Sequence, residues 1–323
     1  MSKSSLSMMV QVKTKVQEAE DVVRFELVDP HGRELPAFTA GAHLDVQTDA
    51  EHMRQYSLSN APSESHRYQI AVLRETDSRG GSVAMHDKVQ EGDLIQISAP
   101  RNHFALDDSA EHTLLLAAGI GITPLLAMAE QLHAEGRSFE LHYTAKTRSK
   151  MAFLNDISAS PFADKVHFYF TQEEGGARPD IAELAASPEA GTHLYVCGPN
   201  GFIDNVMDTF KQSGWSSKQL HTEYFEGAEI DTSADGSFEV KLASSGEVYT
   251  IPADKTIAEV LIDNDVDLLT SCEQGICGTC VTRILEGTPE HRDLYLDEDE
   301  HAANDVFTPC CSRAKSKLLV LDL

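Results

Sequence analysis

The sequence has no apolar segment of the kind that carries a chain into or across a membrane. No uninterrupted apolar run among its 323 residues approaches the roughly 18 residues that a membrane-spanning helix needs. The N-terminal stretch Met1–Val10 also lacks the apolar core of a secretory signal peptide. We therefore predict a cytoplasmic protein without a membrane partner.

Basic residues are scarce. The chain has 26 Lys and Arg against 52 Asp and Glu, a formal net charge of −26 at pH 7. Such a chain would repel a nucleic acid, because binding to phosphates depends on Lys and Arg. Half of the charge, −13, falls in residues 228–323, which contain 20 acidic and 7 basic residues. This acidic segment is either an ordinary solvated surface or a docking face for a basic partner.

Cysteine is also rare, but most of the six cysteines follow a metal-binding pattern. Three lie in the segment Cys272–Cys280 and a fourth follows, giving the spacing C-x4-C-x2-C…C of plant-type [2Fe–2S] clusters. Gly275 and Gly278 accept the positive φ angles that such a tight loop needs, so its backbone N–H groups can turn toward the cluster sulfurs. The predicted ligands are Cys272, Cys277, Cys280 and either Cys310 or Cys311.

Zinc and disulfides are the alternatives for these cysteines. Structural zinc sites usually contain two C-x2-C pairs or a mixture of Cys and His, and only one short pair is present here. Disulfides are typical of secreted chains, and this sequence shows no signal peptide. The spacing therefore favours an electron-transfer protein.

Six short β segments separated by turn residues lie in the first hundred residues and predict a small closed barrel. From about Phe104 apolar strands alternate with helical segments, which predicts a doubly wound parallel sheet. The barrel strands are Met9–Lys13, Val23–Leu27, His43–Val46, Arg54–Ser59, Tyr68–Leu73 and Leu94–Ile97. The sheet strands are Leu114–Ala118, Phe139–Tyr143, Val166–Phe170 and Leu194–Cys197, with helices at Pro124–His133 and Gly201–Gln212.

A small, polar segment at 227–236 reads as a linker to a third domain. That domain is predicted to contain a hairpin of Phe238–Leu242 with Val248–Ile251, a helix from Thr256 to about Asp263, and a closing strand Leu318–Leu321. The predicted domains are therefore 1–103, 104–226 and 237–323. We find no internal repeat or low-complexity tract.

Two further regions of the sequence have the residue types of nucleotide sites. The first combines Arg54–Asn60 with Arg79–Ser82, and the second combines Ala117–Pro124 with Cys197–Pro199. In Arg54–Asn60, an aromatic ring could stack on a flavin, a hydroxyl could bind its polar edge, and Arg54 could pair with its phosphate. The segment Arg79–Ser82 precedes a predicted short helix, and such a glycine-rich entrance presents N–H groups to phosphate. An ordinary surface strand with Tyr and Arg is the alternative.

The second segment, Ala117–Pro124, follows an apolar strand. Gly119 and Gly121 permit a tight strand-to-helix turn, Thr123 could cap the helix, and Pro124 suits its first turn. The helix N-terminus could then bind a pyrophosphate, although Pro124 stands where a Rossmann fingerprint has its third glycine. Cys197–Pro199 follows another strand at the same sheet edge, where Cys197 is either a site residue or a plain core cysteine.

These three sites, in this order, resemble the phthalate dioxygenase reductase family over essentially the whole chain. The family includes vanillate O-demethylase reductases and the reductases of carnitine-type oxygenases. The matching motifs are R-x-Y-S-L-S at Arg54–Ser59, G-G-S at Gly80–Ser82, G-I-G-I-T-P at Gly119–Pro124, C-G-P at Cys197–Pro199, E-x-F at Glu223–Phe225, C-E-x-G-x-C-G-x-C at Cys272–Cys280 and C-x-S-R at Cys310–Arg313.

The resemblance implies roles for these residues and places the fourth cluster ligand at Cys310, with Cys311 as a neighbour. It implies an FMN-binding barrel, an NAD-binding α/β domain and a C-terminal α+β ferredoxin domain with the β-grasp fold. The implied flavin residues are Arg54, Gln55, Tyr56, Ser57, Val72, Leu73, Arg74, Gly80, Gly81, Ser82 and Phe225. The implied nicotinamide residues are Gly119, Gly121, Thr123, Pro124, Cys197, Gly198 and Pro199. The implied catalytic set is Ser57, Cys197, Glu223 and Phe225.

The implied function is the reductase component of an oxygenase system. A hydride passes from NADH to FMN, and electrons then pass singly through the [2Fe–2S] cluster to a Rieske-type oxygenase. Lys146, Arg148 and Lys150 are a departure, because cations at the predicted ribose site could also accept the 2′-phosphate of NADPH. NADH remains the expected donor.

Two other functions stay open from the sequence. The chain could be a free-standing NADH diaphorase or flavin reductase. It could also be a redox-responsive iron–sulfur protein whose cluster senses the redox state rather than transferring electrons. Aromatic acids and quaternary amines are both open as final substrates.

Overall fold

The computed structural model describes the whole chain except residues 1–5, 49–52, 76–79 and 229. The chain divides into two compact units, Leu6–Phe225 and Glu226–Leu323. Within the described residues no helix is long and apolar enough to cross a bilayer. The predicted boundary between residues 103 and 104 falls inside the first unit, and Arg79 of the predicted phosphate segment lies outside the described residues.

The first unit begins with an antiparallel β-barrel whose strands follow the order β4-β3-β6-β1-β2-β5, with β7 paired to β3. Apolar residues from these strands form one core, which includes Phe25, Leu44 and Ile70. All six predicted strands are present. The elements are β1 Leu6–Ala19, β2 Val22–Val28, β3 Ala42–Gln47, β4 Met53–Ser57, β5 Tyr68–Leu73, α1 Gly81–Asp87, β6 Leu94–Ser98 and β7 Arg101–Asn102.

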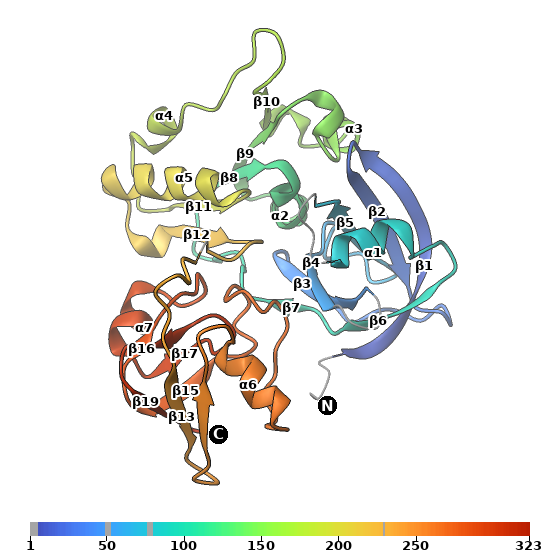
Figure 1. Cartoon of the computed structure of the whole chain (residues 1–323). Helices are drawn as coiled ribbons and strands as arrows, with labels where there is room; N and C mark the ends of the chain where they lie inside the picture. The colour runs from blue at the N-terminus through green and yellow to red at the C-terminus, as the bar shows by residue number, and fades with distance from the viewer. Residues whose placement is uncertain (1–5, 49–52, 76–79, 229) are drawn as a thin grey trace. The chain divides into compact units, whose positions relative to one another are not determined.

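A parallel sheet of order β10-β9-β8-β11-β12 follows in the same unit (Figure 1). Its central strand β8 is buried along almost its whole length, as expected for a strand covered on both faces. α2 packs in the core on one face and α5 in the core on the other. The strands are β8 His112–Ala118, β9 Ser138–Ala145, β10 Val166–Phe170, β11 Thr192–Cys197 and β12 Leu220–Glu223. The α-helices are α2 Ile122–Ala134, α3 Leu154–Ser158, α4 Ile181–Ala185 and α5 Asn200–Gln212, with 3-10 turns at 119–121, 148–150, 163–165 and 217–219.

Trp215 anchors the turn after α5. Its indole N–H donates to the carbonyl of Ala185 at 3.0 Å, and its ring lies 4.9 Å from that of Phe210, measured between centroids. Both rings belong to the apolar core on the α5 face of the sheet. This contact connects α4, α5 and the strand β12 that follows.

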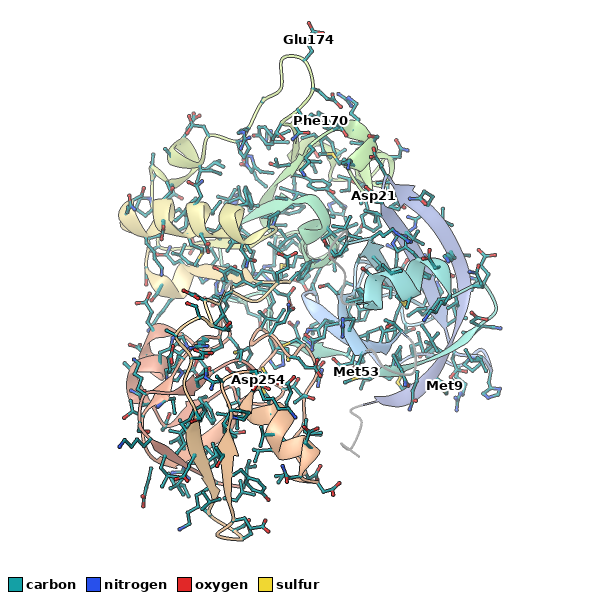
Figure 2. The ribbon with its side chains drawn as sticks, viewed as in Figure 1. Met9, Asp21, Met53, Phe170, Glu174 and Asp254 are labelled. Carbon is teal, nitrogen blue, oxygen red and sulfur yellow. The ribbon has the colours of Figure 1, made fainter. Side chains whose placement is uncertain are left out.

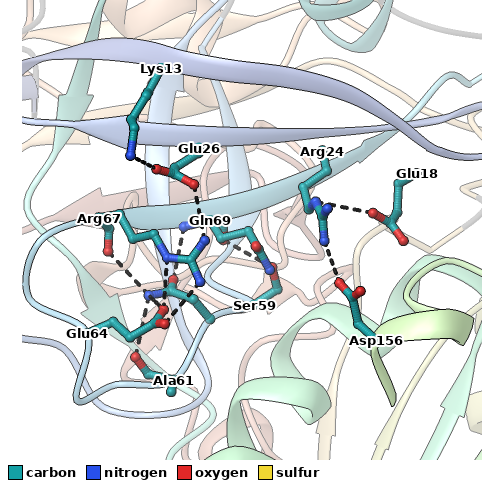
Figure 3. Close-up of polar contacts among 11 residues, drawn as sticks. Lys13, Glu18, Arg24, Glu26, Ser59, Ala61, Glu64, Arg67, Gln69 and Asp156 are labelled. Carbon is teal, nitrogen blue, oxygen red and sulfur yellow. Dashed lines mark hydrogen bonds and ion pairs between the residues drawn. The ribbon is translucent and has the colours of Figure 1, made fainter. Parts of the chain in front are cut away.

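Ion pairs connect the barrel to the parallel sheet region. Arg24 on β2 pairs with Glu18 on β1 at 3.2 Å and with Asp156 in α3 at 2.5 Å (Figure 3). Glu18 also accepts a hydrogen bond from the backbone N–H of Phe153 at 2.8 Å. These polar contacts add to a shared apolar core, in which Val22 and Ala71 of the barrel pack with buried residues of the sheet region.

The second unit is a mixed sheet of order β14-β13-β19-β15-β17, in which β13 and β19 run parallel. Buried and exposed residues alternate along β13, so one face of the strand packs on the core. α6, predicted from Thr256 to about Asp263, spans Ile257–Asp263 and begins at a capping box of Thr256 and Glu259. The elements are β13 Phe238–Leu242, β14 Val248–Ile251, α6 Ile257–Asp263, β15 Thr282–Glu286, β16 Pro289–Glu290, α7 Glu298–Ala303, β17 Val306–Phe307, β18 Arg313–Ala314 and β19 Leu318–Leu321.

Sequence reasoning missed several elements. β12 and β15 were not predicted as strands, and the acidic run at Asp297 was not predicted to form α7. Asp297 caps that helix and Glu300 completes the capping box, so these two carboxylates have structural partners. Part of the acidic segment therefore serves local folding.

Candidate functional site

The four cysteines of the predicted cluster lie together inside the second unit. All are buried, and every cysteine of the chain is a free thiol. Cys272 accepts hydrogen bonds from Cys277 and Cys310, and these contacts hold the pKa of Cys272 far below its ordinary value, at about 2. Cys310 also contacts Cys280. Four sulfur donors that converge in a buried loop fit the ligand demand of a [2Fe–2S] cluster.

The loop backbone is shaped for this arrangement. Gly275 and Gly278 have φ angles of 72° and 68°, which confirms the predicted positive φ at both. A Cβ at Gly275 would lie 2.9 Å from the Cβ of Asp293, so the loop could not keep this path with another residue. The backbone N–H groups of Gln274 and Ile276 donate to the sulfur of Cys272 at 3.4 and 3.5 Å. Such bonds stabilise a thiolate.

Cys311 has a different environment from Cys310. Its sulfur shares hydrogen bonds with the hydroxyls of Thr308 at 3.3 Å and Ser312 at 3.9 Å. It also lies where a side chain on Gly275 would be. Cys310 instead contacts two of the three loop cysteines, Cys272 and Cys280.

In the first unit, Arg54 on β4 lies against Gly81 at the start of α1. A Cβ at Gly81 would lie 2.5 Å from Cγ and 2.9 Å from Nε of Arg54, so glycine leaves room for this side chain. Gly80 has a φ of 95°, and the hydroxyl of Ser82 accepts a hydrogen bond from the N–H of Glu75 at 3.3 Å. The structure thus brings a guanidinium to the glycine-rich turn, as a phosphate site requires.

The other predicted flavin residues occupy varied positions. Tyr56 packs against the barrel core, and burial raises the pKa of its hydroxyl. Gln55 donates to buried Asp45 at 3.0 Å. Val72 belongs to the barrel core and Leu73 to the edge of the sheet core. Arg74 forms two bonds with Asp87, at 2.7 and 2.9 Å, so its guanidinium already has a carboxylate partner.

Ser57, Cys197 and Glu223 meet although they are far apart in the sequence. They end β4, β11 and β12, and Cys197 and Glu223 are partners in the register of the parallel strands. The hydroxyl of Ser57 donates to Oε2 of Glu223 at 3.5 Å. Burial raises the pKa of Glu223 to about 8, although the bond from Ser57 opposes this shift. Glu223 is therefore protonated at neutral pH and can hold or donate a proton.

Burial raises the pKa of Cys197 as well, and the carboxyl of Glu223 adds to that shift. Its thiol is completely buried and stays neutral, so it is a compact apolar wall beside Glu223. Phe225 follows two residues after Glu223 and packs, partly buried, against the sheet core.

His43 is a member of this region that sequence reasoning missed. It lies on β3, 4 % exposed, with Nδ1 at 4.0 Å from Oε1 of Glu223. The segment His43–Val46 was predicted only as a strand. Nothing in the alternation of that strand singles out a histidine that will face a carboxyl group 180 residues later in the chain.

The strand-to-helix turn after β8 approaches the end of β11 closely. A Cβ at Gly121 would lie 2.6 Å from the N atom of Gly198, and one at Gly198 would lie 2.8 Å from the Cβ of Ala118. Pro199 directly precedes α5. The two glycines thus let the backbone of both turns meet at the carboxyl edge of the sheet, where ligands of such sheets bind.

The predicted cap of α2 was wrong. The cap residue is Gly121, and no side chain of the described residues caps the helix. Thr123 lies inside the first turn, where its hydroxyl donates to the carbonyl of Ile120 at 3.0 Å. Pro124 lies in the first turn as predicted. The N–H groups at this end are therefore left without a side-chain cap, which suits an anion.

The predicted cations after β9 are largely paired with carboxylates. Arg148 lies 3.6 Å from Glu173 and over the ring of Phe170, while Lys150 lies 3.3 Å from Glu20 and 3.4 Å from Asp21. Figure 2 shows Phe170 at the end of β10, with Glu174 in the loop beyond it. Lys146 is exposed. The pairs lower the local positive charge that a 2′-phosphate would need.

Family models match three parts of the chain. Residues 9–106 match an oxidoreductase FAD-binding domain, and residues 240–315 match a 2Fe-2S iron-sulfur cluster binding domain. Residues 95–220 match the N-terminal domain of dimethylamine monooxygenase subunit DmmA-like proteins.

Curated and solved proteins are similar over the full length. The vanillate O-demethylase oxidoreductase of Pseudomonas putida is 49% identical over 313 residues, covering 97% of this chain and 98% of that protein. The carnitine monooxygenase reductase subunit of Escherichia coli K12 is 40% identical over 318 residues, covering 97% and 98%. The solved phthalate dioxygenase reductase, described as a modular structure for electron transfer from pyridine nucleotides to [2Fe–2S], matches with a TM-score of 0.76, 39% identity and 98% of each chain.

Proposed function

Because the chain belongs to the phthalate dioxygenase reductase family of iron–sulfur flavoprotein oxidoreductases, we propose that it carries electrons from NADH through FMN and a [2Fe–2S] cluster to a Rieske-type oxygenase. The observation that carries this proposal is the convergence of four buried cysteines in the same chain as a flavin-type barrel and a parallel nucleotide sheet. An enzyme that only reduced free flavin would not need the cysteine loop.

Cys310, rather than Cys311, is the proposed fourth ligand with Cys272, Cys277 and Cys280. Cys310 contacts Cys272 and Cys280, whereas Cys311 has hydroxyl partners in Thr308 and Ser312. Two irons with two thiolates each use all four of the converging sulfurs.

FMN is the proposed flavin. The Arg54 guanidinium beside Gly81 supports a phosphate site in which Arg54 pairs with the anion and Gly80–Ser82 provide N–H groups. Gln55, Tyr56 and Ser57 are proposed to contact the ring on one side, with Val72–Arg74 along the other edge. Identification of the flavin released on denaturation, by mass spectrometry, tests FMN against FAD.

A bound flavin would supply what side chains cannot, accepting two electrons with a hydride and passing them on one at a time. The proposed task of Ser57 and Glu223 is to hold a proton near the reacting ring, since Glu223 is protonated at neutral pH. Cys197 is proposed to exclude water and to shape the face on which the nicotinamide lies. Phe225, which packs against the edge of the sheet core, is proposed to lie beside the ring.

NADH is the proposed donor in preference to NADPH. Gly119, Gly121, Thr123 and Pro124 would place the pyrophosphate at the end of α2, and Cys197, Gly198 and Pro199 would line the nicotinamide. The pairing of Arg148 with Glu173 and of Lys150 with Glu20 supports NADH, because a 2′-phosphate would compete with those carboxylates. The ratio of kcat/KM for the two nucleotides tests this preference.

The proposed domains remain 1–103, 104–226 and 237–323, with a linker at 227–236. A cytoplasmic location is proposed with them, supported by six cysteines that are all free thiols. Expression of the three segments separately, with flavin and iron content as readouts, tests the boundaries.

A Rieske-type oxygenase is the proposed acceptor, since ferredoxin-type clusters near about −400 mV transfer electrons downhill to Rieske clusters at about −150 to +300 mV. Relatives named as a vanillate O-demethylase oxidoreductase and a carnitine monooxygenase reductase leave aromatic acids and quaternary amines open as oxygenase substrates.

The test is anaerobic stopped-flow mixing of the NADH-reduced protein with a purified Rieske oxygenase. We expect rapid bleaching of the Rieske centre. Rapid reduction of ferricyanide without reduction of any such centre would identify a diaphorase instead.

A further inference from the structure

The outer part of the parallel sheet carries a group of potential metal ligands that the electron path does not use. Glu140 and His142 lie on β9 and His167 lies on β10, with one ligand atom of each within 4.8 Å of the others. Figure 1 shows these two neighbouring strands, and β10 is the last strand of the sheet. We propose that Glu140, His142 and His167 form a binding site for a divalent transition-metal ion of the zinc type.

The backbone places the three residues on one face. Glu140 and His142 are two residues apart on a strand, so their side chains point to the same side of the sheet. His142 and His167 are direct partners in the parallel pairing of β9 and β10. Their rings stack with centroids 4.6 Å apart and planes 20° apart, so both imidazoles project in the same direction.

His142 has the contacts of a ligand held in place by a supporting hydrogen bond. It is 5 % exposed, and its Nδ1 lies 3.0 Å from the hydroxyl of Tyr169. Its Nε2 makes no hydrogen bond with any residue that the structure describes, and it lies 3.5 Å from Oε2 of Glu140. A hydrogen bond at one ring nitrogen that leaves the other nitrogen for a metal is the usual arrangement of metal-binding histidines.

The geometry suits a small ion with little rearrangement. Tetrahedral zinc with bonds of about 2.0–2.1 Å needs ligand atoms about 3.4 Å apart. The separation between Nε2 of His142 and Oε2 of Glu140 already meets this distance, and a ring nitrogen of exposed His167 lies within 4.8 Å of the other two ligand atoms. Glu140 has about half of its side chain exposed, at 49 %, so an ion can enter from solvent.

The ligand types favour zinc over calcium or magnesium. Two imidazole nitrogens and one carboxylate oxygen are the protein ligands of open zinc sites, whereas Ca²⁺ and Mg²⁺ prefer oxygen alone. The formal charge of −26 also raises the local concentration of cations. A bound ion would connect the edge strand β10 to β9 and so stabilise the outer part of the nucleotide sheet.

Among the described residues, two other groups of two histidines and one carboxylate lie elsewhere, and the test has to distinguish zinc bound there from zinc bound at Glu140, His142 and His167. In one, His193 and His221 already share a hydrogen bond of 3.0 Å, and in the other, His291 and His301 flank Asp293 beside the cysteine loop. The experiment therefore uses the holoprotein, in which the four cluster cysteines are occupied, and follows the loss of one zinc site in selected variants.

Zn²⁺ is titrated by calorimetry into the wild type and into His167→Ala, Glu140→Gln and His66→Ala. His66 is exposed and belongs to none of the three groups, so His66→Ala is the matched control. We expect His167→Ala to weaken one zinc site at least tenfold, Glu140→Gln to weaken the same site less, and His66→Ala to bind as the wild type does. Zinc K-edge absorption should show that the site has only nitrogen and oxygen ligands at about 2.0–2.1 Å.

Unchanged zinc stoichiometry and affinity in both His167→Ala and Glu140→Gln would overturn the proposal. So would a shell containing sulfur at about 2.3 Å, because it would place the ion at cysteines instead. Flavin and iron contents of the variants, which should match the wild type, show that the fold is intact.

Discussion

The two units assemble their sites in opposite ways. In Glu226–Leu323, three of the four converging cysteines come from one nine-residue loop, Cys272–Cys280, and only Cys310 is distant. In Leu6–Phe225, Ser57, Cys197 and Glu223 come from three strands and meet only because the barrel and the sheet pack as one unit. The cluster site therefore depends on local loop geometry, and the site around Glu223 depends on the fold of the whole unit.

The contrast extends to the charges at the two sites. Cysteine sulfurs are anions when they bind a cluster. The loop stabilises the sulfur of Cys272 with hydrogen bonds from the backbone N–H groups of Gln274 and Ile276. At the other site, burial keeps Glu223 and Cys197 protonated and neutral. A substitution in one unit should thus remove one function and leave the other measurable.

The largest expected effect is that of Cys310→Ser. Removal of one of the four converging sulfurs should abolish the cluster and reduction of cytochrome c, because the terminal carrier is lost. Ferricyanide reduction by NADH should remain near the wild-type rate, since the flavin site lies in the other unit. Iron analysis and the two assays, made on the same preparation, check this prediction.

Cys311→Ser is the matched control for that experiment. A serine can keep the hydrogen bonds with Thr308 and Ser312, and the small hydroxyl fits beside Gly275. We expect full iron content and cytochrome c reduction. Loss of the cluster in Cys311→Ser but not in Cys310→Ser would make Cys311 the fourth ligand.

The next effect concerns the dependence of stability on pH in the unit Leu6–Phe225. Folded Glu223 binds its proton with a pKa of about 8, against an ordinary value of 4.5 in the unfolded chain. The folded state therefore holds one more proton between these values, and its stability falls as pH rises through them, by at most about 5 kcal/mol. Glu223→Gln should remove this slope, measured as denaturant unfolding at several pH values.

Asp108→Asn is the control, because the side chain of Asp108 is fully exposed. Its pH profile should coincide with that of the wild type. An unchanged slope in Glu223→Gln would show that Glu223 ionises normally in the folded protein.

Arg54→Ala tests the flavin end of the same unit. Loss of a charge-assisted contact to a phosphate costs about 1.5–3 kcal/mol, which weakens flavin binding roughly 10- to 150-fold. The cluster spectrum should not change. Flavin content after gel filtration provides the measurement, with Arg33→Ala as a control for an exposed arginine that pairs with Asp29. Full flavin occupancy in Arg54→Ala would make Arg54 an ordinary strand residue.

The smallest effect is electrostatic and concerns the acidic segment 228–323. Charges steer an encounter only over a Debye length of about 10 Å at 0.1 M salt. Electron transfer to the oxygenase should therefore slow as salt rises, whereas flavin reduction by NADH should change less. Stopped-flow measurement of both steps at low and high salt shows how strongly each rate constant depends on salt concentration.

The structure sharpens this test, because Asp297 and Glu300 cap α7 and should be left unchanged. The double variant Glu298→Gln/Asp299→Asn removes exposed charge from the first turn of α7. As a control, Glu239→Gln on β13 removes one exposed charge elsewhere in the unit. Equal salt slopes for both steps would mean that the acidic segment is only a solvated surface.

The difference between the units also explains how much the sequence could predict. The cysteine spacing and the two glycines specify a loop directly, since positive φ at Gly275 and Gly278 is a local requirement. The barrel strands and four strands of the parallel sheet follow from alternation and apolar runs. Those features depend on neighbours in the chain.

The features that were missed depend on distant residues. The position of His43 near Glu223 is decided by the pairing of β3 with β4 and by the packing of the barrel on the sheet. Thr123 was predicted as a cap because its residue type favours caps, but the turn at Gly121 begins the helix earlier. β12 was missed because only Leu220 of its four residues is apolar, so it has no apolar run.

Trp215 is the only tryptophan of the chain, and it is buried in the apolar core of the first unit. Its fluorescence therefore reports on that unit alone, and the cysteine-rich unit is silent at the same wavelength. Heating the protein while recording indole emission and visible absorption of the iron–sulfur chromophore would give two separate melting curves from one sample. The position of a single ring thus makes the independence of the two units directly measurable.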